Sequence, residues 1–420
     1  MSRRYEYDVV VVGGGSAGVA AAVGATRCGA RTLLVERNPY LGGEATNSGV
    51  AAFCGFFTCG GDPVKVVAGV GDMVLEEMEK LGDNTFNYIV SASGNKNINF
   101  QPEYLKCALD NLMDAEGAEY LLHTSLIGAE VCGGSIQSLQ FMDDEGLFTV
   151  KASCFVDATG DANLANLAGA ETVWGDGEGN VQAATLTFRL SGVDTSKPMT
   201  PDAVAEAIAK AKEAGITHLT KEKGFIQVRK DSGIVVVLLP SVMPKGLNAK
   251  ELTDLEKDAR KQALAYAEAF RRFMPGMENC EVAVMGPSLG FRETRRIVGR
   301  GTVTAQDVLE RRKCETGIGR GGWKPEIHKS LNQMAEYMDV ENGSYFDIPL
   351  EALQSANVEN LYGAGRVVSA DSVGFAAVRV MGTCFATGQA AGVAAAIQAK
   401  KGSAEAGQVR AELEKQGAMI

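Results

Sequence analysis

The distribution of apolar residues near the start of the chain predicts a strand, a helix and a second strand. An apolar run within residues 8–12 is typical of a parallel strand that is buried on both faces. A glycine-rich turn follows, and the alanine-rich segment 16–28 predicts a helix. A second apolar run, residues 31–35, ends at Glu36. This order of elements predicts a βαβ unit at the head of a parallel sheet.

The rest of the chain falls into three parts with different patterns. Up to residue 161 we expect further helices and short strands, at residues 62–82, 101–117 and 119–157, with turns at 132–135 and 143–146. Strand-like segments then alternate with charged helices, at residues 185–190, 201–214, 225–228, 234–239 and 249–273. Near the end we expect a strand at 358–362 and helices at 382–398 and 403–416. The sequence therefore predicts one domain in two pieces, residues 1–169 and 346–420, and a substrate domain, residues 170–345.

The composition disfavours several classes of protein. With 420 residues, 45% of them hydrophobic, the chain is long enough for two folded domains. A formal net charge of −11 disfavours nucleic acid or an anionic membrane as the main partner. The N-terminal residues contain no apolar signal core, and nine scattered cysteines are typical of reduced thiols. We expect a cytoplasmic protein that binds neither nucleic acid nor membrane, with formation of a homo-oligomer left open.

A nucleotide-binding fingerprint lies between the first strand and the first helix. In Gly13-x-Gly15-x-x-Gly18, the first glycine permits the tight turn and the second lets backbone N–H groups approach a pyrophosphate. Gly18 lets the helix pack closely on the strand, and the helix N-terminus adds partial positive charge for the phosphates. Glu36 ends the second strand, where a carboxylate can hold ribose hydroxyl groups.

Two further glycine segments extend this pattern. Glu36-Arg37-x-x-x-Leu41-Gly42-Gly43 follows the second strand, and Leu361-Tyr-Gly-Ala-Gly365-Arg366 lies near the end of the chain. With these and with residues 156–161, 291–307 and 321–328, the chain resembles the FAD-dependent oxidoreductases of the glutathione-reductase and fumarate-reductase flavoprotein superfamily, in particular a bacterial branch of it. The resemblance implies FAD as cofactor. It also implies an α/β fold, a Rossmann-like FAD-binding domain of the glutathione-reductase type with an inserted α+β substrate domain.

The resemblance also assigns contacts with the cofactor. It implies that the diphosphate and the adenosine ribose contact Gly13, Gly15, Ser16, Ala17, Gly18, Glu36 and Arg37. Gly42, Gly43, Glu44, Ala45 and Thr46 would lie beside the ribityl chain and flavin, the backbone of Leu126 or Ile127 would meet the adenine, and Ala158, Thr159, Gly160 and Asp161 would close over the phosphates. Gly365 and Arg366 would flank the diphosphate and ribityl chain, and the helix starting at Met381, Gly382 and Thr383 would point its N-terminus at the flavin pyrimidine edge. Reduced flavin carries negative charge there, which a helix N-terminus stabilises.

Two arginines are candidates for binding a substrate anion. Arg292 begins a segment with three arginines in five residues, and a guanidinium can clamp a carboxylate through two hydrogen bonds. The alternative is a structural ion-pair network that involves Glu293. Arg379 is the second candidate, because the residues next to it are implied to lie by the flavin. Further along, Thr304 and Asp307 have the spacing of a helix cap.

Two residues are candidates for moving a proton. His328 closes a segment that matches the family, where it could act as acid or base. Relatives often carry a histidine in the stretch after the Ala-Gly-Arg motif, but this chain has Asp371 and Ser372 there, and either is a candidate substitute. Cys54 and Cys59 stand too far after Gly43 to match the redox pair of disulfide reductases. We therefore expect both to be packed side chains that line the site, and the sequence does not decide whether they are redox-active. No Cys/His spacing indicates a metal site.

These patterns predict an FAD-dependent oxidoreductase that transfers a hydride between flavin N5 and a small, anionic organic substrate. The catalytic candidates are Arg292, Arg379, His328 and Asp371. Two alternatives remain open, an NAD(P)H-driven flavin monooxygenase or reductase and an FAD electron-relay subunit that works only with partners. The chain shows no second dinucleotide fingerprint in a strand–turn–helix context, which disfavours a separate nicotinamide domain. The sequence identifies neither the substrate nor the electron acceptor.

Overall fold

The computed structural model describes residues 3–91, 94–224, 226–229 and 232–420. Its largest sheet has the strand order β6-β2-β1-β9-β8-β7, with β22 beside β9. The parallel part consists of β6 (Glu119–Leu121), β2 (Thr32–Val35), β1 (Arg3–Val12), β9 (Gly146–Asp157) and β22 (Leu361–Gly363). Val9, Val10 and Val11 are fully buried, as predicted for a strand covered on both faces. The predicted α/β class with a parallel core is confirmed, while the glutathione-reductase type stays a prediction.

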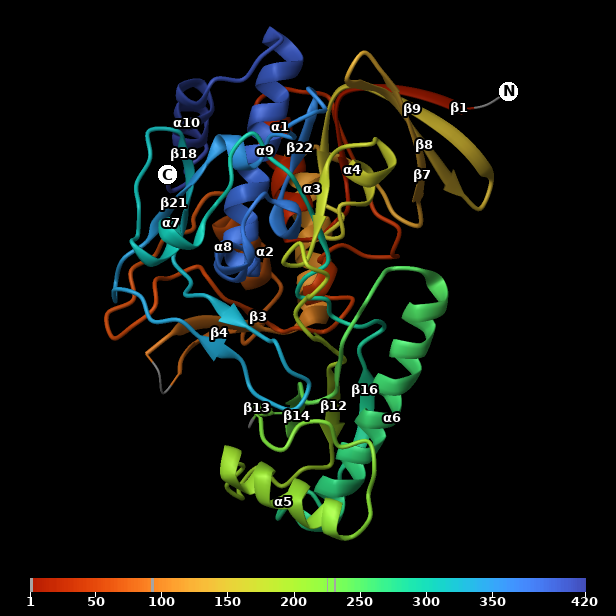
Figure 1. Ribbon diagram of the computed structural model, residues 1–420, viewed down its shortest axis with the longest axis vertical. Coiled ribbons are helices and arrows are strands. Elements are labelled where there is room, and N and C mark those ends of the chain that lie inside the picture. The colour runs from red at the N-terminus through yellow and green to blue at the C-terminus, as the bar shows by residue number, and fades with distance from the viewer. Residues whose placement is uncertain (1–2, 92–93, 225, 230–231) are drawn as a thin grey trace.

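Strand β9 connects two kinds of pairing. Its first half pairs antiparallel with β8 (Ser135–Asp143), which in turn pairs antiparallel with β7 (Ser125–Cys132). Its second half lies between β1 and β22, both parallel to it, so the two ends of the chain share one sheet (Figure 1). β22 starts at Leu361 instead of residue 358 as predicted, because the Leu361 N–H bonds back to the carbonyl of Val358 in a turn.

Two helices from opposite ends of the chain pack against each other on this sheet. Helix α1 (Ser16–Arg27) lies beside α9 (Met381–Lys401), drawn red and blue in Figure 1. A Cβ atom on Gly388 or Gly392 would lie 2.1 or 1.9 Å from a backbone oxygen of α1, so only glycine permits this approach. The glycine- and alanine-rich composition near the C-terminus is therefore explained by helix packing.

A smaller sheet and two helices cover one side of the cofactor domain. The sheet has the order β3-β5-β4, formed by β3 (Ala52–Phe53), β5 (Lys96–Phe100) and β4 (Phe86–Val90). Helix α3 (Pro102–Glu116) is where the sequence predicts it, but α2 spans only Val70–Lys80, not 62–82. The earlier residues are irregular, since Gly69 has a φ of 66° that ends any helix approaching from the N-terminal side.

Residues from 184 to 289 build a second unit with its own apolar core, at the bottom of Figure 1. Its sheet has the order β13-β14-β12-β16, with β13 (Ile226–Arg229), β14 (Ile234–Val237), β12 (Phe188–Ser191) and β16 (Glu281–Met285). Helices α5 (Pro201–Glu213) and α6 (Ala249–Phe273) cover one face of it. The side chains of Thr200 and Asn248 cap these two helices, which explains why both start close to their predicted positions. Phe225, part of a predicted strand, lies outside the described residues.

The buried residues favour a shorter inserted domain than the sequence predicts. The second apolar core is drawn from residues 184–289, whereas Val303, Val308 and Ile318 are buried in the core of the cofactor domain. We therefore propose that the inserted domain ends near residue 291, and that the following residues, up to the predicted boundary at 345, pack with the FAD-binding part.

The remaining elements are short. They are α4 (Asn163–Leu167), β10 (Thr172–Trp174), β11 (Ala184–Thr185), β15 (Ser241–Val242), β17 (Arg295–Ile297), α7 (Ala305–Leu309), β18 (Gly317–Gly321), β19 (Glu326–Ile327), β20 (Glu336–Tyr337), β21 (Phe346–Pro349), α8 (Ser372–Val378) and α10 (Ala406–Lys415). The predicted cap of Thr304 and Asp307 is present at the start of α7. Among the described residues no single helix is long and apolar enough to cross a membrane, and α8 with α9 reaches that size only across a 94° bend.

Candidate active site

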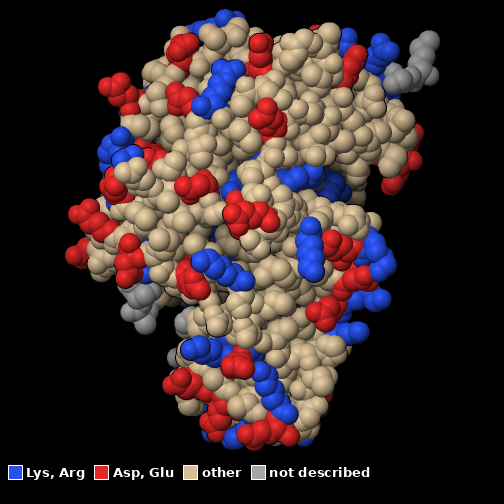
Figure 2. Space-filling model, viewed as in Figure 1, with Lys and Arg blue, Asp and Glu red and all other residues tan. Residues whose placement is uncertain are grey.

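A cleft of about 310 Å³ lies where the two units meet. Figure 2 shows Lys and Arg side chains in the recess between the upper body and the lower unit, although the protein as a whole is acidic. Most residues predicted to contact the cofactor line this cleft, namely Gly13, Gly15, Ser16, Ala17, Glu36, Arg37, Gly42, Gly43, Glu44, Ala158, Thr159, Gly160, Asp161, Gly365, Arg366 and Met381. The fold therefore gathers five separate segments of the chain into one site.

Several predicted contacts lie outside this cleft. They are Gly18, Ala45, Thr46, Leu126, Ile127, Gly382 and Thr383. Leu126 lines a neighbouring cavity that also reaches Glu36, while Ile127 is 39% exposed. A Cβ on Gly18 would lie 1.7 Å from the carbonyl oxygen of Gly13, and one on Gly382 2.5 Å from that of Cys54, so both glycines serve close packing. The inserted domain adds lining residues that the sequence did not indicate, such as Leu247, Leu252 and Glu256.

The N-terminus of α1 is built to receive an anion. Gly13 has a φ of 103°, which turns the chain from β1 into the helix. Gly15 occupies the N-cap position, and no side chain accepts a hydrogen bond from the first turn. Free N–H groups at a helix N-terminus bind phosphate well. This donor set therefore fits the diphosphate of a dinucleotide.

Glu36 is held in place in the wall of the cleft. It is 7% exposed, its Oε2 accepts the N–H of Gly14 at 2.6 Å, and its Oε1 accepts two hydrogen bonds from Asn38, at 2.9 and 2.8 Å. An ionised carboxylate has about four acceptor positions, so it can accept a further hydrogen bond from a ribose hydroxyl. Sequence reasoning missed the role of Asn38, which fixes the orientation of this carboxylate.

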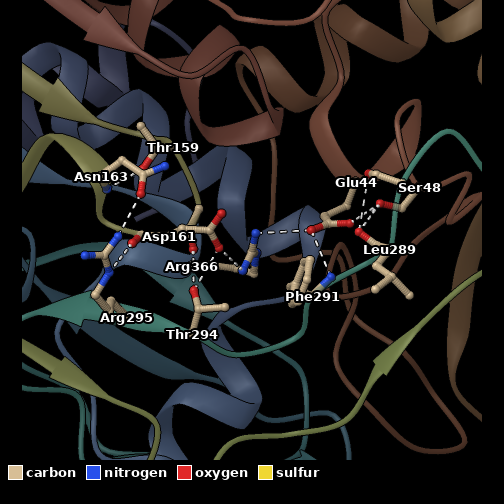
Figure 3. A network of polar contacts seen from close by, with 12 residues as sticks. Glu44, Ser48, Thr159, Asp161, Asn163, Leu289, Phe291, Thr294, Arg295 and Arg366 are labelled. Carbon is tan, nitrogen blue, oxygen red and sulfur yellow. Dashed lines mark hydrogen bonds and ion pairs between the residues drawn. The ribbon is translucent and has the colours of Figure 1, made fainter. Parts of the chain in front are cut away.

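A buried polar network forms the floor of the cleft (Figure 3). Arg366 contacts Glu44 at 3.1 Å and Asp161 at 3.4 Å, and its side chain is 13% exposed. Burial raises the pKa of Glu44, while the charge of Arg366 and a hydrogen bond from Ser48 oppose this effect. Thr294 donates to Asp161 at 2.8 Å. The network holds together the second glycine pair, the turn after β9 and the Ala-Gly-Arg motif.

The structure separates the roles of the three clustered arginines. Arg295 donates to the carbonyl of Asp161 and to the side chain of Asn163, as Figure 3 shows. Arg296 forms a buried ion pair with Glu293 at 3.0 Å. Arg292 instead points its Nη1 at the carbonyl of Ala183 and the hydroxyl of Thr185, at 2.7 and 2.8 Å. The scaffold reading of this segment therefore applies to Arg295 and Arg296. Neither Arg292 nor Arg295 forms an ion pair within 4.0 Å among the described residues, but Arg295 is bound to the turn after β9, whereas Arg292 is bound to residues 183 and 185 of the inserted unit.

Next to the cleft, a short hairpin of β19 and β20 carries a second polar cluster. Oε1 of Glu326 lies 3.1 Å from His328 Nε2 and accepts a hydrogen bond from the Tyr337 hydroxyl at 3.1 Å. Arg379, which lines the cleft, donates to the carbonyl of Glu326 at 3.0 Å and to Oε1 of Gln182 at 3.3 Å. Glu326 and His328 stand two residues apart at a strand, a spacing that places both on one face. Sequence reasoning missed Glu326, and its two-residue spacing from His328 is the pattern that could have identified it.

The charges in this cluster set the protonation of His328. Burial and the positive charge of Arg292 lower the pKa of His328 to about 4, despite its contact with Glu326. Burial alone would raise the pKa of Glu326, but the hydrogen bond from His328 and the charges of Arg379 and Arg292 outweigh it, and the pKa lies below its usual range. At neutral pH a neutral imidazole therefore faces a carboxylate, and we assign its proton to Nε2 because that nitrogen faces Glu326.

Asp371 has a structural position. Its Oδ1 accepts hydrogen bonds from the N–H groups of Val373 and Gly374 and so caps α8, and its Oδ2 accepts the N–H of Ala305. Both carboxylate oxygens are thus occupied by backbone donors, so the structure favours helix capping over proton transfer for this residue.

Cys54 and Cys59 lie together with Trp323 and Val380 in a small apolar cluster. Burial raises the pKa of both thiols, which keeps them protonated at neutral pH. A protonated thiol is a poor nucleophile, so the structure favours the predicted lining role over a redox pair.

Comparisons with known proteins place this site in a family. The sequence model of a family described as FAD dependent oxidoreductase matches residues 8–415. A 3-oxosteroid 1-dehydrogenase of Mycolicibacterium smegmatis is 52% identical over 44 residues, covering 10% of this chain and 8% of that protein. A fumarate reductase (cytochrome) of Shewanella frigidimarina is 55% identical over 38 residues, covering 9% of this chain and 7% of that protein. This chain thus matches less than a tenth of the length of either curated relative.

Two solved structures show the same fold at low sequence identity. BexE, studied for oxidation during BE-7585A biosynthesis, has a TM-score of 0.51 at 12% identity, with 98% of this chain and 66% of that chain covered. The flavin-dependent brominase Bmp2 has a TM-score of 0.50 at 14% identity, with 98% of this chain and 84% of that chain covered. The donors at the α1 N-terminus and the carboxylate of Glu36 are consistent in chemistry with a dinucleotide such as FAD. Because the family match extends over almost the whole chain, this protein belongs to the FAD dependent oxidoreductases and is an enzyme with FAD as its cofactor.

Proposed function

We propose that this enzyme oxidises or reduces a small organic anion, with bound FAD supplying the hydride acceptor or donor at flavin N5. The observation that supports this proposal is a set of unpaired donors beside the cleft. Among the described residues, neither Arg292 nor Arg379 has a carboxylate within 4.0 Å, and Arg379 Nε and Gln182 Nε2 are buried without a hydrogen-bond partner. Buried cations and donors without partners are costly. A carboxylate, which only accepts hydrogen bonds, would satisfy them.

Residues of the chain itself would bind the substrate and transfer the proton. We assign binding of the substrate carboxylate to Arg292 and Arg379, whose positions are fixed by hydrogen bonds to Thr185 and to Gln182. His328, neutral at physiological pH, can accept a proton at Nδ1 while Nε2 stays directed at Glu326. Glu326 is a positioning residue, because it acts by orienting the imidazole. Asp371 is left out of this scheme for the reason given above.

Removal of the Arg292 guanidinium should impair substrate binding and leave the cofactor in place. An anaerobic screen of small carboxylates and their amides should find an acid that bleaches the flavin when its neutral amide does not. For that acid, Arg292→Ala should raise KM by roughly 10- to 100-fold, the loss expected for charge-assisted hydrogen bonds. The measurement is KM together with the ratio of flavin to protein. Arg300→Ala, at an exposed arginine, is the control. Loss of flavin from the Arg292 variant would make this arginine part of the scaffold.

Nicotinamide cofactors should not reduce this flavoprotein. The chain contains one dinucleotide fingerprint in a strand–turn–helix context, at Gly13–Gly18, and we assign the cleft beside it to FAD. We expect the visible spectrum of the purified protein to stay oxidised under anaerobic NADH and then NADPH, while dithionite bleaches it. Rapid bleaching by either nucleotide would favour the alternative, an NAD(P)H-driven monooxygenase or reductase. Substrate turnover by the purified protein without any partner would exclude the other alternative, an FAD electron-relay subunit.

A further inference from the structure

The loop between α5 and β13 carries a lysine that has no partner for its charge. Lys221 is 7% exposed, although lysine is among the residues least often buried. No hydrogen bond or ion pair within 4.0 Å joins its ammonium group to another of the described residues. No sequence pattern marked this residue as functional. It lies in a charged loop within residues 170–285, the part of the chain in which the family resemblance is weakest.

The position of Lys221 is fixed by helix α6. The hydroxyl of the fully buried Tyr266 accepts the N–H of Lys221 at 2.7 Å and lies 3.2 Å from its carbonyl oxygen, to which it donates. The preceding residue, Thr220, donates to the side chain of Gln262 at 2.7 Å, and Gln262 also holds Ser241. Both α6 side chains are buried, so this loop is held at a defined place instead of lying loosely on the surface.

The surroundings of Lys221 carry an excess of positive charge. Arg292, after β16, and Glu326, on β19, are the charged groups that act on it, and Tyr266 on α6 is the titratable group in contact with it. Glu326 also interacts electrostatically with Arg292 and Arg379, so the charge of one carboxylate is shared among three cations. The other nearby carboxylates are occupied, since Glu44 pairs with Arg366 and Glu293 with Arg296. An anion bound among these cations would remove the repulsion between them.

We propose that Lys221 binds the carboxylate of the substrate together with Arg292. This inference rests on the proposed function, and it adds a specificity-determining residue that the inserted domain supplies. The substrate anion would then be held from three directions: by the α5–β13 loop, by the segment after β16, and by Arg379 of the cofactor domain. Binding would thus join the two units of the fold at the cleft.

The proposal predicts that anion binding weakens at alkaline pH. Burial and the positive charge of Arg292 lower the pKa of Lys221 to about 8, with Glu326 opposing them. The ammonium group attracts a carboxylate only while it is protonated, so binding is strongest below this pKa and is lost as the pH rises through it. Arginine stays charged over this range, so the contribution of Arg292 and Arg379 does not follow this profile.

The test uses the oxidised holoenzyme and three probes, succinate, acetate and benzoate, with changes in the flavin absorbance as the readout of binding. Titrations over a pH series compare the wild type with Lys221→Met and Lys221→Arg. Lys223→Met, at an exposed lysine of the same loop, is the matched control. The Lys221→Arg variant keeps a cation, so it tests the pH dependence even if the methionine variant folds poorly.

For the best-bound probe we expect the wild-type Kd to increase above about pH 8. Lys221→Met should raise Kd about tenfold at neutral pH and remove the alkaline increase. Lys221→Arg should bind well at every pH, and Lys223→Met should behave as the wild type. Wild-type affinity in Lys221→Met would overturn this inference and leave the proposed function standing. Absence of any spectral change in the wild type with all three probes would overturn both.

Discussion

Gly15→Val should abolish FAD binding and leave the rest of the fold intact. Gly15 has a φ of −72°, which any residue adopts, so valine introduces no backbone strain. Its Cβ would meet nothing closer than Gly43 Cα at 3.7 Å, but the branched side chain would extend into the cleft that both glycines line. The phosphates would lose their hydrogen bonds from the first turn of α1. We expect affinity for FAD to fall by about 100-fold or more.

The measurement is the ratio of flavin to protein after purification, followed by titration of the apoprotein with FAD. Thermal unfolding of the variant should be compared with that of deflavinated wild type, because bound cofactor itself raises Tm. Gly61→Val is the control, since a Cβ there meets nothing within 4 Å. Gly18→Ala should differ from both, because its Cβ would lie 1.7 Å from a backbone oxygen and should destabilise the apoprotein as well. Normal flavin content in Gly15→Val would show that the phosphates bind elsewhere.

Arg296→Met should be the most destabilising single change among the arginines of the 292–296 segment. Its side chain is 3% exposed and pairs with Glu293, itself 5% exposed, at 3.0 Å. Methionine would leave that carboxylate buried with an N–H of Gln182 as its remaining hydrogen bond. Breaking a buried pair from one side costs about 3–5 kcal/mol. The loss should shrink as the pH falls, because burial raises the pKa of Glu293 and a protonated carboxyl leaves no unpaired charge.

The measurement is the Tm at saturating FAD, where we expect a fall of roughly 5–10 °C. The double variant Arg296→Met with Glu293→Gln should recover much of the loss, because it removes both charges. Arg300→Met, at an exposed position, should leave Tm nearly unchanged. If the double variant were as unstable as Arg296→Met, the hydrogen bond from Arg296 to the carbonyl of Ala370, and not the ion pair, would explain the effect.

Local sequence patterns were enough to predict the main helices and strands and the nucleotide-binding turn of this protein. Helix α6 was predicted at residues 249–273 and is found there, because its cap and its apolar spacing are properties of neighbouring residues. The fingerprint at Gly13–Gly18 and Glu36 identified the nucleotide site in the same way, since the whole βαβ unit is contiguous in sequence. The helix expected from residue 62 was placed too early because Gly69, at its positive φ, ends the regular backbone.

Only the tertiary structure decided which charged groups meet. Sequence reasoning selected Arg292 of the three clustered arginines, but it did not show that Arg295 and Arg296 are occupied by Asn163 and Glu293. In contrast, Arg292 and Glu326 influence the charge of Lys221 only because tertiary folding brings the inserted unit near the β19–β20 hairpin. These residues are far apart in the sequence and no periodic pattern links them, so their proximity could not be predicted from the sequence. The nucleotide fingerprint is therefore local in the sequence, whereas the proposed substrate site depends on long-range packing that brings uncompensated charges together.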